Sequence, residues 1–369
     1  MENRSLLRIA SVNAVGFSAS TVMPLWLGGV AHAFGMPAWF AGAAVVAQLG
    51  GAALFNLLTP ILFGRFSLLP LARVGLLVAA AGYLLAVTAS PALFITACFL
   101  SGGALGTVLN VTNRLMGSGD HVQKGYAIFL LIEICFATVV FLGSSALMAR
   151  FGLRAVFPVV GATALLAFVI LWRLPVALTP SGAPERQALG ADRLPAMMAL
   201  GAFALFFIGQ ATLNGFMPTI GQAAGLDAQS AAQIIGLGMP FGFAGAMLAR
   251  LVGDRVRPIV PVTIVVLLLA CAAPLLTLMP TVTIYTMGVI ALAVSTMFSV
   301  PYFFAHLATF DAGGRYTAFG PAMMLTGIAT GPSVAVLLDA TFGLGAVGLF
   351  AAALLLIGGG VFAFSVRRG

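Results

Sequence analysis

Residues 180–193, PSGAPERQALGADR, form the longest polar stretch of the chain. The stretch is rich in proline, glycine and charge, and it lies at the middle of the 369 residues. Because this composition is typical of a connecting segment, we interpret it as a linker between two domains. The expected domains are residues 1–174 and 195–369, with the linker at 175–194.

The regions on either side of the linker are strongly apolar. Hydrophobic residues make up 61% of the chain and charged residues only 7%, whereas soluble domains average about 25% charged residues. A helix needs about 20 apolar residues to cross a bilayer core of about 30 Å. We therefore expect an all-α integral membrane protein with twelve transmembrane helices in two six-helix bundles. The expected spans are about 8–32, 38–62, 70–89, 92–115, 124–148, 155–174, 195–221, 228–249, 259–279, 281–307, 315–340 and 344–365.

The placement of basic residues predicts the topology of these spans. With twelve spans both termini lie on one side, and only Arg150 and Arg154 fall on the other side, which leaves 15 of the 17 basic residues on the side of the termini. By the positive-inside rule this side is cytoplasmic. The expected location is the cell inner membrane, as a multi-pass protein.

The two halves carry an internal repeat. With a shift of 191 residues, Asp120-x-x-x-Lys124 falls on Asp311-x-x-x-Arg315, and Met23-Pro24 resembles Met217-Pro218 after a short gap. Two related halves place a substrate at their interface near the midplane, where rocking of the halves gives alternating access.

These features resemble the major facilitator superfamily over essentially the whole chain. Residues 253–258, GDRVRP, are similar to the charged loop that follows span 8 of that family, although the glycine spacing differs. The first-half copy at Gly64-Arg65-Phe66 keeps an arginine but has no aspartate. Residues 311–332 resemble the sugar-efflux and drug-efflux branch around span 11, whereas span 5 lacks the Gly-Pro signature of that branch and span 4 lacks its mid-membrane arginine.

The resemblance implies a secondary transporter of a small organic solute, which we expect to be proton-coupled and monomeric. A facilitator that needs no proton is the alternative. A membrane-embedded enzyme or a receptor is a further alternative, but no catalytic set of residues converges in the sequence, so we expect no enzyme activity. No P-loop is present, which excludes a nucleotide-driven pump on this chain alone. Protons, the solute and lipid are the expected partners, with no nucleic acid and no cofactor.

Glu133 is the main candidate for proton coupling or substrate contact. It lies nine residues into span 5, which places it about 14 Å deep at 1.5 Å per residue. A charge at that depth is costly unless it faces water, has a partner or takes up a proton. The alternative role is structural, as a protonated side chain that bonds to a neighbouring helix.

Polar residues inside other spans are candidates for lining a central cavity. Buried amides also join helices without touching a substrate, and both roles remain open for each residue. Tyr302 near the end of span 10 has two possible roles of its own, as part of an aromatic wall or as an interfacial anchor, and anchoring is favoured for His306. The cavity candidates are Asn13, Ser20, Gln48, Asn56, Asn110, Gln210, Asn214, Gln233 and Tyr302.

Charged residues at the cytoplasmic ends of the spans are candidates for a gate. We expect one latch between Arg65 and Asp311. A second is expected between Asp254 and Lys124. The alternative is a set of local i,i+4 pairs, such as Asp120 with Lys124, which contribute only a few tenths of a kcal/mol. The gate candidates are Arg65, Asp120, Lys124, Asp254, Arg255, Arg257, Asp311 and Arg315.

Cysteine and histidine give no sign of a metal site. Cys98, Cys135 and Cys271 each lie inside an apolar run, and their number is odd, so we interpret them as small buried apolar residues. The three histidines lie in different loops or helix ends. No metal site is expected.

Overall fold

A helix satisfies all of its backbone polar groups internally, so apolar sequences of this length form helices in lipid. The computed structural model describes residues 3–62, 66–88, 90–117, 122–174, 193–310 and 315–368. Twelve segments among these residues are long and apolar enough to cross a membrane, in agreement with the expected spans. The chain divides into two units, Met1–Pro184 and Glu185–Gly369, and this division falls inside the expected linker.

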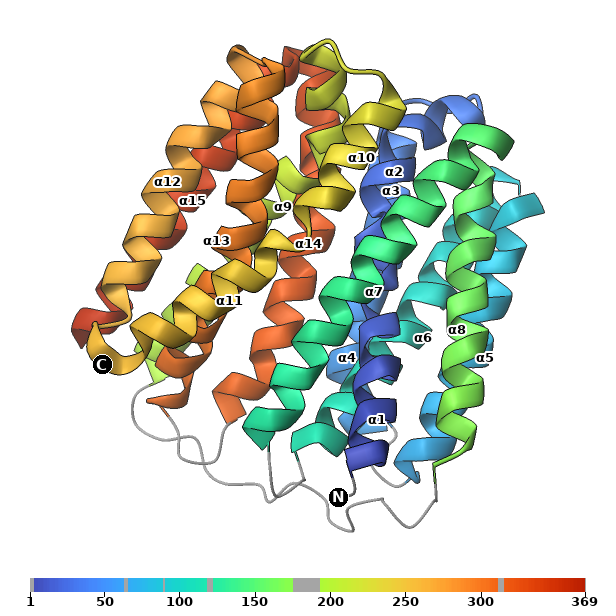
Figure 1. Ribbon diagram of the computed structural model, residues 1–369, viewed down its shortest axis with the longest axis horizontal. Coiled ribbons are helices and arrows are strands. Elements are labelled where there is room, and N and C mark those ends of the chain that lie inside the picture. The colour runs from blue at the N-terminus through green and yellow to red at the C-terminus, as the bar shows by residue number, and fades with distance from the viewer. Residues whose placement is uncertain are drawn as a thin grey trace. The chain divides into compact units, whose positions relative to one another are not determined.

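The first unit begins with a broken helix and contains six spans (Figure 1). Its elements are α1 (Asn3–Gly16), α2 (Ser18–Ala33), α3 (Trp39–Val45), the π-helical turn η1 (Val46–Gly50), α4 (Gly51–Leu62), α5 (Leu68–Thr88), α6 (Pro91–Gly117), α7 (Val122–Phe151), the 3-10 turn η2 (Leu153–Ala155) and α8 (Val156–Trp172).

The second unit repeats this order of spans (Figure 1). Its elements are α9 (Arg193–Ala223), α10 (Ala228–Gly238), α11 (Phe241–Val252), the 3-10 turn η4 (Gly253–Arg255), α12 (Ile259–Leu278), α13 (Val282–Ala308), α14 (Arg315–Phe342) and α15 (Leu344–Arg368).

Corresponding helices make the same contacts in both units. In the first unit α4 packs on α6, α5 on α8, and α1 on α7. In the second unit the equivalent pairs are α11 on α13, α12 on α15, and α9 on α14. The two halves are therefore pseudo-symmetric six-helix bundles, as the sequence repeat predicts.

Two pairs of glycines show the repeat at the level of the backbone. Gly35 (φ 62°) and Gly225 (φ 88°) both end the first span of their unit, and Gly152 (φ 83°) and Gly343 (φ 81°) both precede the last span. The same turn closes the carboxyl end of the first span in both units. Met36 N–H donates to Ala31 O at 2.8 Å, and Leu226 N–H donates to Gly221 O at 3.0 Å. A positive φ favours glycine because it has no Cβ, so the repeated glycines mark repeated turns.

Within the described residues, three spans contain interruptions that the hydropathy pattern did not predict. The first span breaks at Phe17 between α1 and α2, the second contains the π-helical turn η1, and the eighth breaks at Met239-Pro240. Exposure of cysteines also differs from expectation, since Cys98 is buried whereas Cys135 and Cys271 are exposed. An apolar run does not distinguish a lipid-facing position from a core position, which is why the prediction for these two cysteines was wrong.

Arg73 on α5 caps the carboxyl end of α8. Its Nη2 donates to the carbonyl oxygens of Leu171 (3.2 Å), Trp172 (3.3 Å) and Leu174 (3.1 Å). The guanidinium carbon also lies 4.9 Å from the ring centroid of Trp172. The last carbonyls of a helix have no partner within the helix and carry partial negative charge, so this arginine stabilises the end of α8.

We expect Arg73→Ala to lower the free energy of unfolding by about 2 kcal/mol, because hydrogen bonds that involve a charged group contribute about that much. Thermal unfolding of the detergent-solubilised protein measures the change. The matched control is Arg150→Ala, since Arg150 is an exposed arginine at the end of α7. Equal midpoints for the two variants would contradict the capping role.

Candidate functional site

The candidate site of the first unit is built around the break in the first span. Phe17 adopts φ −89° and ψ −1° at the break, and its carbonyl oxygen accepts bonds from the hydroxyls of Ser20 (2.8 Å) and Thr21 (3.1 Å). The ring centroid of Phe17 lies 6.0 Å from that of Phe129 on α7. The break therefore lies beside α7, one helical turn before Glu133.

Glu133 is half-buried in α7. It is eleven residues beyond Val122, the first residue of α7, which corresponds to about 17 Å along the helix. Among the described residues, no hydrogen bond or ion pair with its carboxylate is found. An acid with no counter-charge among the described side chains thus lies inside a membrane-spanning helix, on the element that packs against α1 and α2.

Asn13 lies on α1 before the break and is fully buried. Its Nδ2 donates to Thr112 Oγ1 at 2.9 Å and to Asn113 Oδ1 at 2.8 Å, both on α6. Its own Oδ1 is buried without a hydrogen-bond partner. Asn113 is a neighbour that the sequence analysis missed, although its spacing of three residues from Asn110 places both amides on one face of α6.

Three further amides of the first unit join pairs of helices. Gln48 Nε2 donates to the Tyr83 hydroxyl at 3.1 Å, from η1 to α5. Asn56 Nδ2 donates to Gly106 O at 3.3 Å, and Asn110 Nδ2 donates to Asn56 O at 3.0 Å, which ties α4 to α6 in both directions. These bonds have the geometry of interhelical contacts, and the cavity-lining role of the three amides stays a prediction.

Two side-chain hydrogen bonds of the second unit join helices that correspond to those joined by Asn13 and Asn110 in the first unit. Gln210 on α9 donates from Nε2 to the hydroxyl of Thr296 on α13. Tyr302 on α13 is buried, and its hydroxyl donates to Ala249 O on α11 at 3.3 Å. The Tyr302 bond joins α13 to α11, which correspond to α6 and α4, the helices that the Asn110 bond joins in the first unit.

Asn214 and Gln233 differ from the other amides because both are exposed. Asn214 lies on α9 and Gln233 on α10, inside segments long and apolar enough to span a membrane. An exposed amide is costly in hydrocarbon, which favours contact with water or solute for these two residues.

His306 does not anchor the chain at the membrane surface, contrary to expectation. Its side chain is 5% exposed, and its Nε2 lies 3.0 Å from the hydroxyl of Ser365 on α15. The rings of Phe310 and Phe362 pack edge-on against it. The position near the helix end suggested an anchor, but packing against α15 covers the ring.

Most of the expected gate lies where the structure gives no side-chain description. Arg65, Asp120 and Asp311 fall outside the described residues. A second group lies in the helical elements α7, η4 and α14, but its side chains are likewise not described. This group consists of Lys124, Asp254 and Arg315.

Two gate candidates are described. Arg255 is exposed and its Nη1 donates to Leu251 O at 2.9 Å, whereas Arg257 is exposed after η4. The bond of Arg255 caps the end of α11 locally. Both latches and the alternative local pairs stay predictions.

Known structures share this fold along nearly the whole chain. The human organic anion transporter MFSD10 (TETRAN) matches with a TM-score of 0.66 and 17% identity, over 98% of this chain and 100% of that one. A bacterial homologue of the human lysosomal transporter Spinster, in an inward-facing occupied conformation, matches with a TM-score of 0.74 and 15% identity, over 99% and 97%. The POT family transporter PepTSo matches with a TM-score of 0.74 and 13% identity, over 100% and 98%.

No curated protein matches the sequence. The family model described as Major Facilitator Superfamily matches residues 9–312, which is most of the chain. With twelve spans in two repeated bundles, the chain belongs to the Major Facilitator Superfamily of membrane transporters.

Proposed function

We propose that the protein is a proton-coupled carrier of a small organic solute, with Glu133 as the group that takes up and releases the proton. The observation that carries this proposal is the Glu133 carboxylate, which lies inside a membrane-spanning helix and has no hydrogen-bond or ion-pair partner among the described residues. An acid in such a place is stable when neutral and costly when charged. Its charge state is therefore sensitive to access to water and to a bound solute.

The polar groups around the break in the first span favour a neutral or cationic solute. On α1, α2 and α6 they are amides and hydroxyls, including Ser20, Asn13 and Asn113. These groups donate and accept hydrogen bonds without carrying charge. The middle of the spans contains no lysine or arginine that would bind an anion, so phosphates and dicarboxylates are disfavoured.

The membrane and orientation follow from charge. We propose the cell inner membrane with both termini cytoplasmic, because the basic residues are concentrated on the side of the termini. The protein acts as a monomer in this proposal, since each chain contains both six-helix units.

Proton flux in proteoliposomes tests the proposed coupling. Vesicles with a trapped pH dye are challenged with sugars, aromatic acids, amines and drug-like cations, and protein-free vesicles serve as the control. We expect one neutral or cationic class to move protons across the membrane. Solute movement without any dye response would contradict coupling and support the facilitator.

A further inference from the structure

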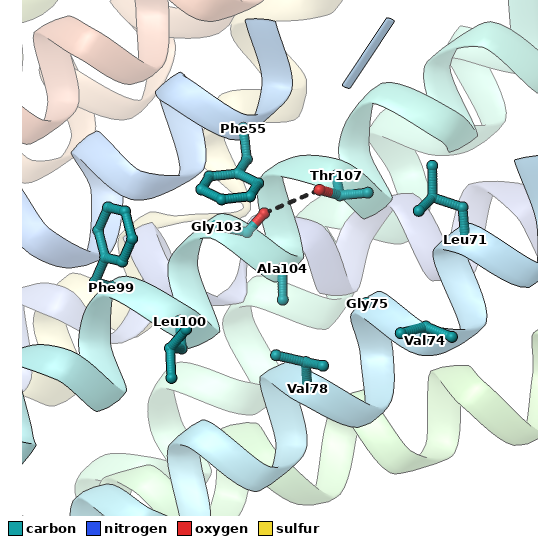
Figure 2. A pocket seen from close by; sticks show the side chains of 10 residues that line it. All are labelled: Phe55, Leu71, Val74, Gly75, Val78, Phe99, Leu100, Gly103, Ala104 and Thr107. Atoms are coloured by element: carbon teal, nitrogen blue, oxygen red, sulfur yellow. Dashed lines mark hydrogen bonds between the residues drawn. The ribbon is translucent and has the colours of Figure 1, made fainter. Parts of the chain in front are cut away.

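An apolar groove lies between α4, α5 and α6 of the first unit (Figure 2). It has a volume of about 170 Å³. The only polar side chain among its lining residues is Thr107, whose hydroxyl donates to Gly103 O at 3.2 Å. The groove therefore offers apolar contacts and no unsatisfied polar side chain. Its walls include Phe55, Val74, Val78, Leu100 and Ala104.

Glycines let the walls of the groove approach closely at two helix contacts. A Cβ on Gly103 would lie 2.9 Å from the ring of Phe55, and a Cβ on Gly75 would lie 3.1 Å from Ala104 O. A side chain at either position would press on these neighbours, so α4 and α5 pack against α6 through glycine beside the groove.

The groove is open on the side that faces lipid. Val74 is 58% exposed and Leu100 is 46% exposed, although both lie in membrane spans. Apolar side chains exposed within a span contact hydrocarbon, because no water is present at that depth. The natural occupant is therefore an acyl chain and not a polar solute.

A basic residue lies on the same face of α6 as the groove. Arg114 is seven residues beyond Thr107, which places it on the same helix face about 10 Å further along. Its side chain is partly exposed, and it has no hydrogen-bond or ion-pair partner among the described residues. A spacing of about 10 Å along α6 between Thr107 and Arg114 suits a lipid whose phosphate lies at the membrane surface, since half of the bilayer core is about 15 Å.

We propose that this groove holds one acyl chain of an anionic phospholipid, whose headgroup binds Arg114. Basic positions between transmembrane helices on the cytoplasmic side attract anionic headgroups, and the distribution of charge assigns the Arg114 end of α6 to that side. Apolar contacts in the groove retain the acyl chain, and the positive charge of Arg114 favours lipids with an anionic headgroup. The site is separate from Glu133 and does not depend on proton coupling.

Native mass spectrometry of the full chain in detergent tests the site. The protein is mixed with equal amounts of phosphatidylglycerol and phosphatidylcholine that carry the same acyl chains. We expect one retained lipid per protein, with phosphatidylglycerol favoured about fivefold, which corresponds to one arginine near the surface. No preference in the wild-type protein would overturn the proposal.

Variants locate the lipid. Ala104→Phe and Val74→Phe fill the groove from two different helices and are expected to lose the adduct, whereas Ala162→Phe at an exposed position of α8 keeps it. Arg114→Gln is expected to lose the preference for phosphatidylglycerol, with Arg150→Gln as the matched control. Size-exclusion profiles show that each variant is folded. The proposal is contradicted if both groove-filling variants retain the lipid as the wild-type protein does. It is also contradicted if Arg114→Gln retains the preference for phosphatidylglycerol.

Discussion

Replacement of Glu133 with glutamine is expected to reduce the proton flux to the level of protein-free vesicles. Glutamine has the size of a protonated glutamate and keeps hydrogen-bonding groups, but it cannot release a proton. Exchange of labelled solute at equal pH on both sides should survive, because this exchange requires no net proton movement. The measurement compares dye response and solute exchange in the same vesicles.

Two control variants separate coupling from folding. Glu133→Asp keeps the acid on a shorter side chain and is expected to retain part of the proton flux. Asp339→Asn removes an acid from the last turn of α14 and is expected to leave the flux unchanged. Full proton movement in Glu133→Gln would exclude the carboxylate as the proton carrier. A solute that moves without a dye response in both wild type and Glu133→Gln would establish the facilitator.

The substitution Gly102→Ala is expected to have the largest effect on folding. A Cβ on Gly102 would lie 1.8 Å from the carbonyl oxygen of Gln48, and a Cβ on Gly106 would lie 2.1 Å from that of Ala52. The obstacle is backbone in both cases, so α6 has to move away from η1 and α4. Overpacking of this kind costs about 3 kcal/mol, and we expect a large loss of folded protein after solubilisation.

A matched glycine tests whether the clash causes the loss. Gly143 lies on α7 in the same unit, and a Cβ there would meet nothing within 4 Å. Gly143→Ala should be neutral or slightly stabilising, since alanine favours a helix over glycine. Thermal unfolding and size-exclusion profiles of both variants measure the difference. Equal midpoints for Gly102→Ala and Gly143→Ala would show that α6 adapts without cost.

The same helix crossing is closed differently in the two units. Phe55 on α4 packs against Gly103 on α6, whereas the equivalent positions of the second unit hold Gly245 on α11 and Val294 on α13. The glycine at this crossing therefore lies on α6 in the first unit, but on α11, the counterpart of α4, in the second unit. A shift of the sequence by about 190 residues detects the repeat but not this exchange, because neither residue shows its partner in the sequence.

The spans, the repeat and the family were determined by the sequence alone. Lipid acts on each helix separately, so length, apolarity and flanking charge are sufficient to identify a span. The candidate Glu133 followed from the same argument, because one acid in an apolar run is visible without any knowledge of its neighbours. Its role in coupling remains a proposal.

Tertiary structure decided which polar groups meet. Asn13 bonds to α6 and Gln210 to α13, across 99 and 86 residues of sequence. The break at Phe17 and the π-helical turn at Val46–Gly50 are likewise absent from the hydropathy pattern. Both kinds of feature depend on the register between helices that are distant in the chain. That register is set by packing of small residues against facing backbone, which a pattern of apolar residues within one span does not encode.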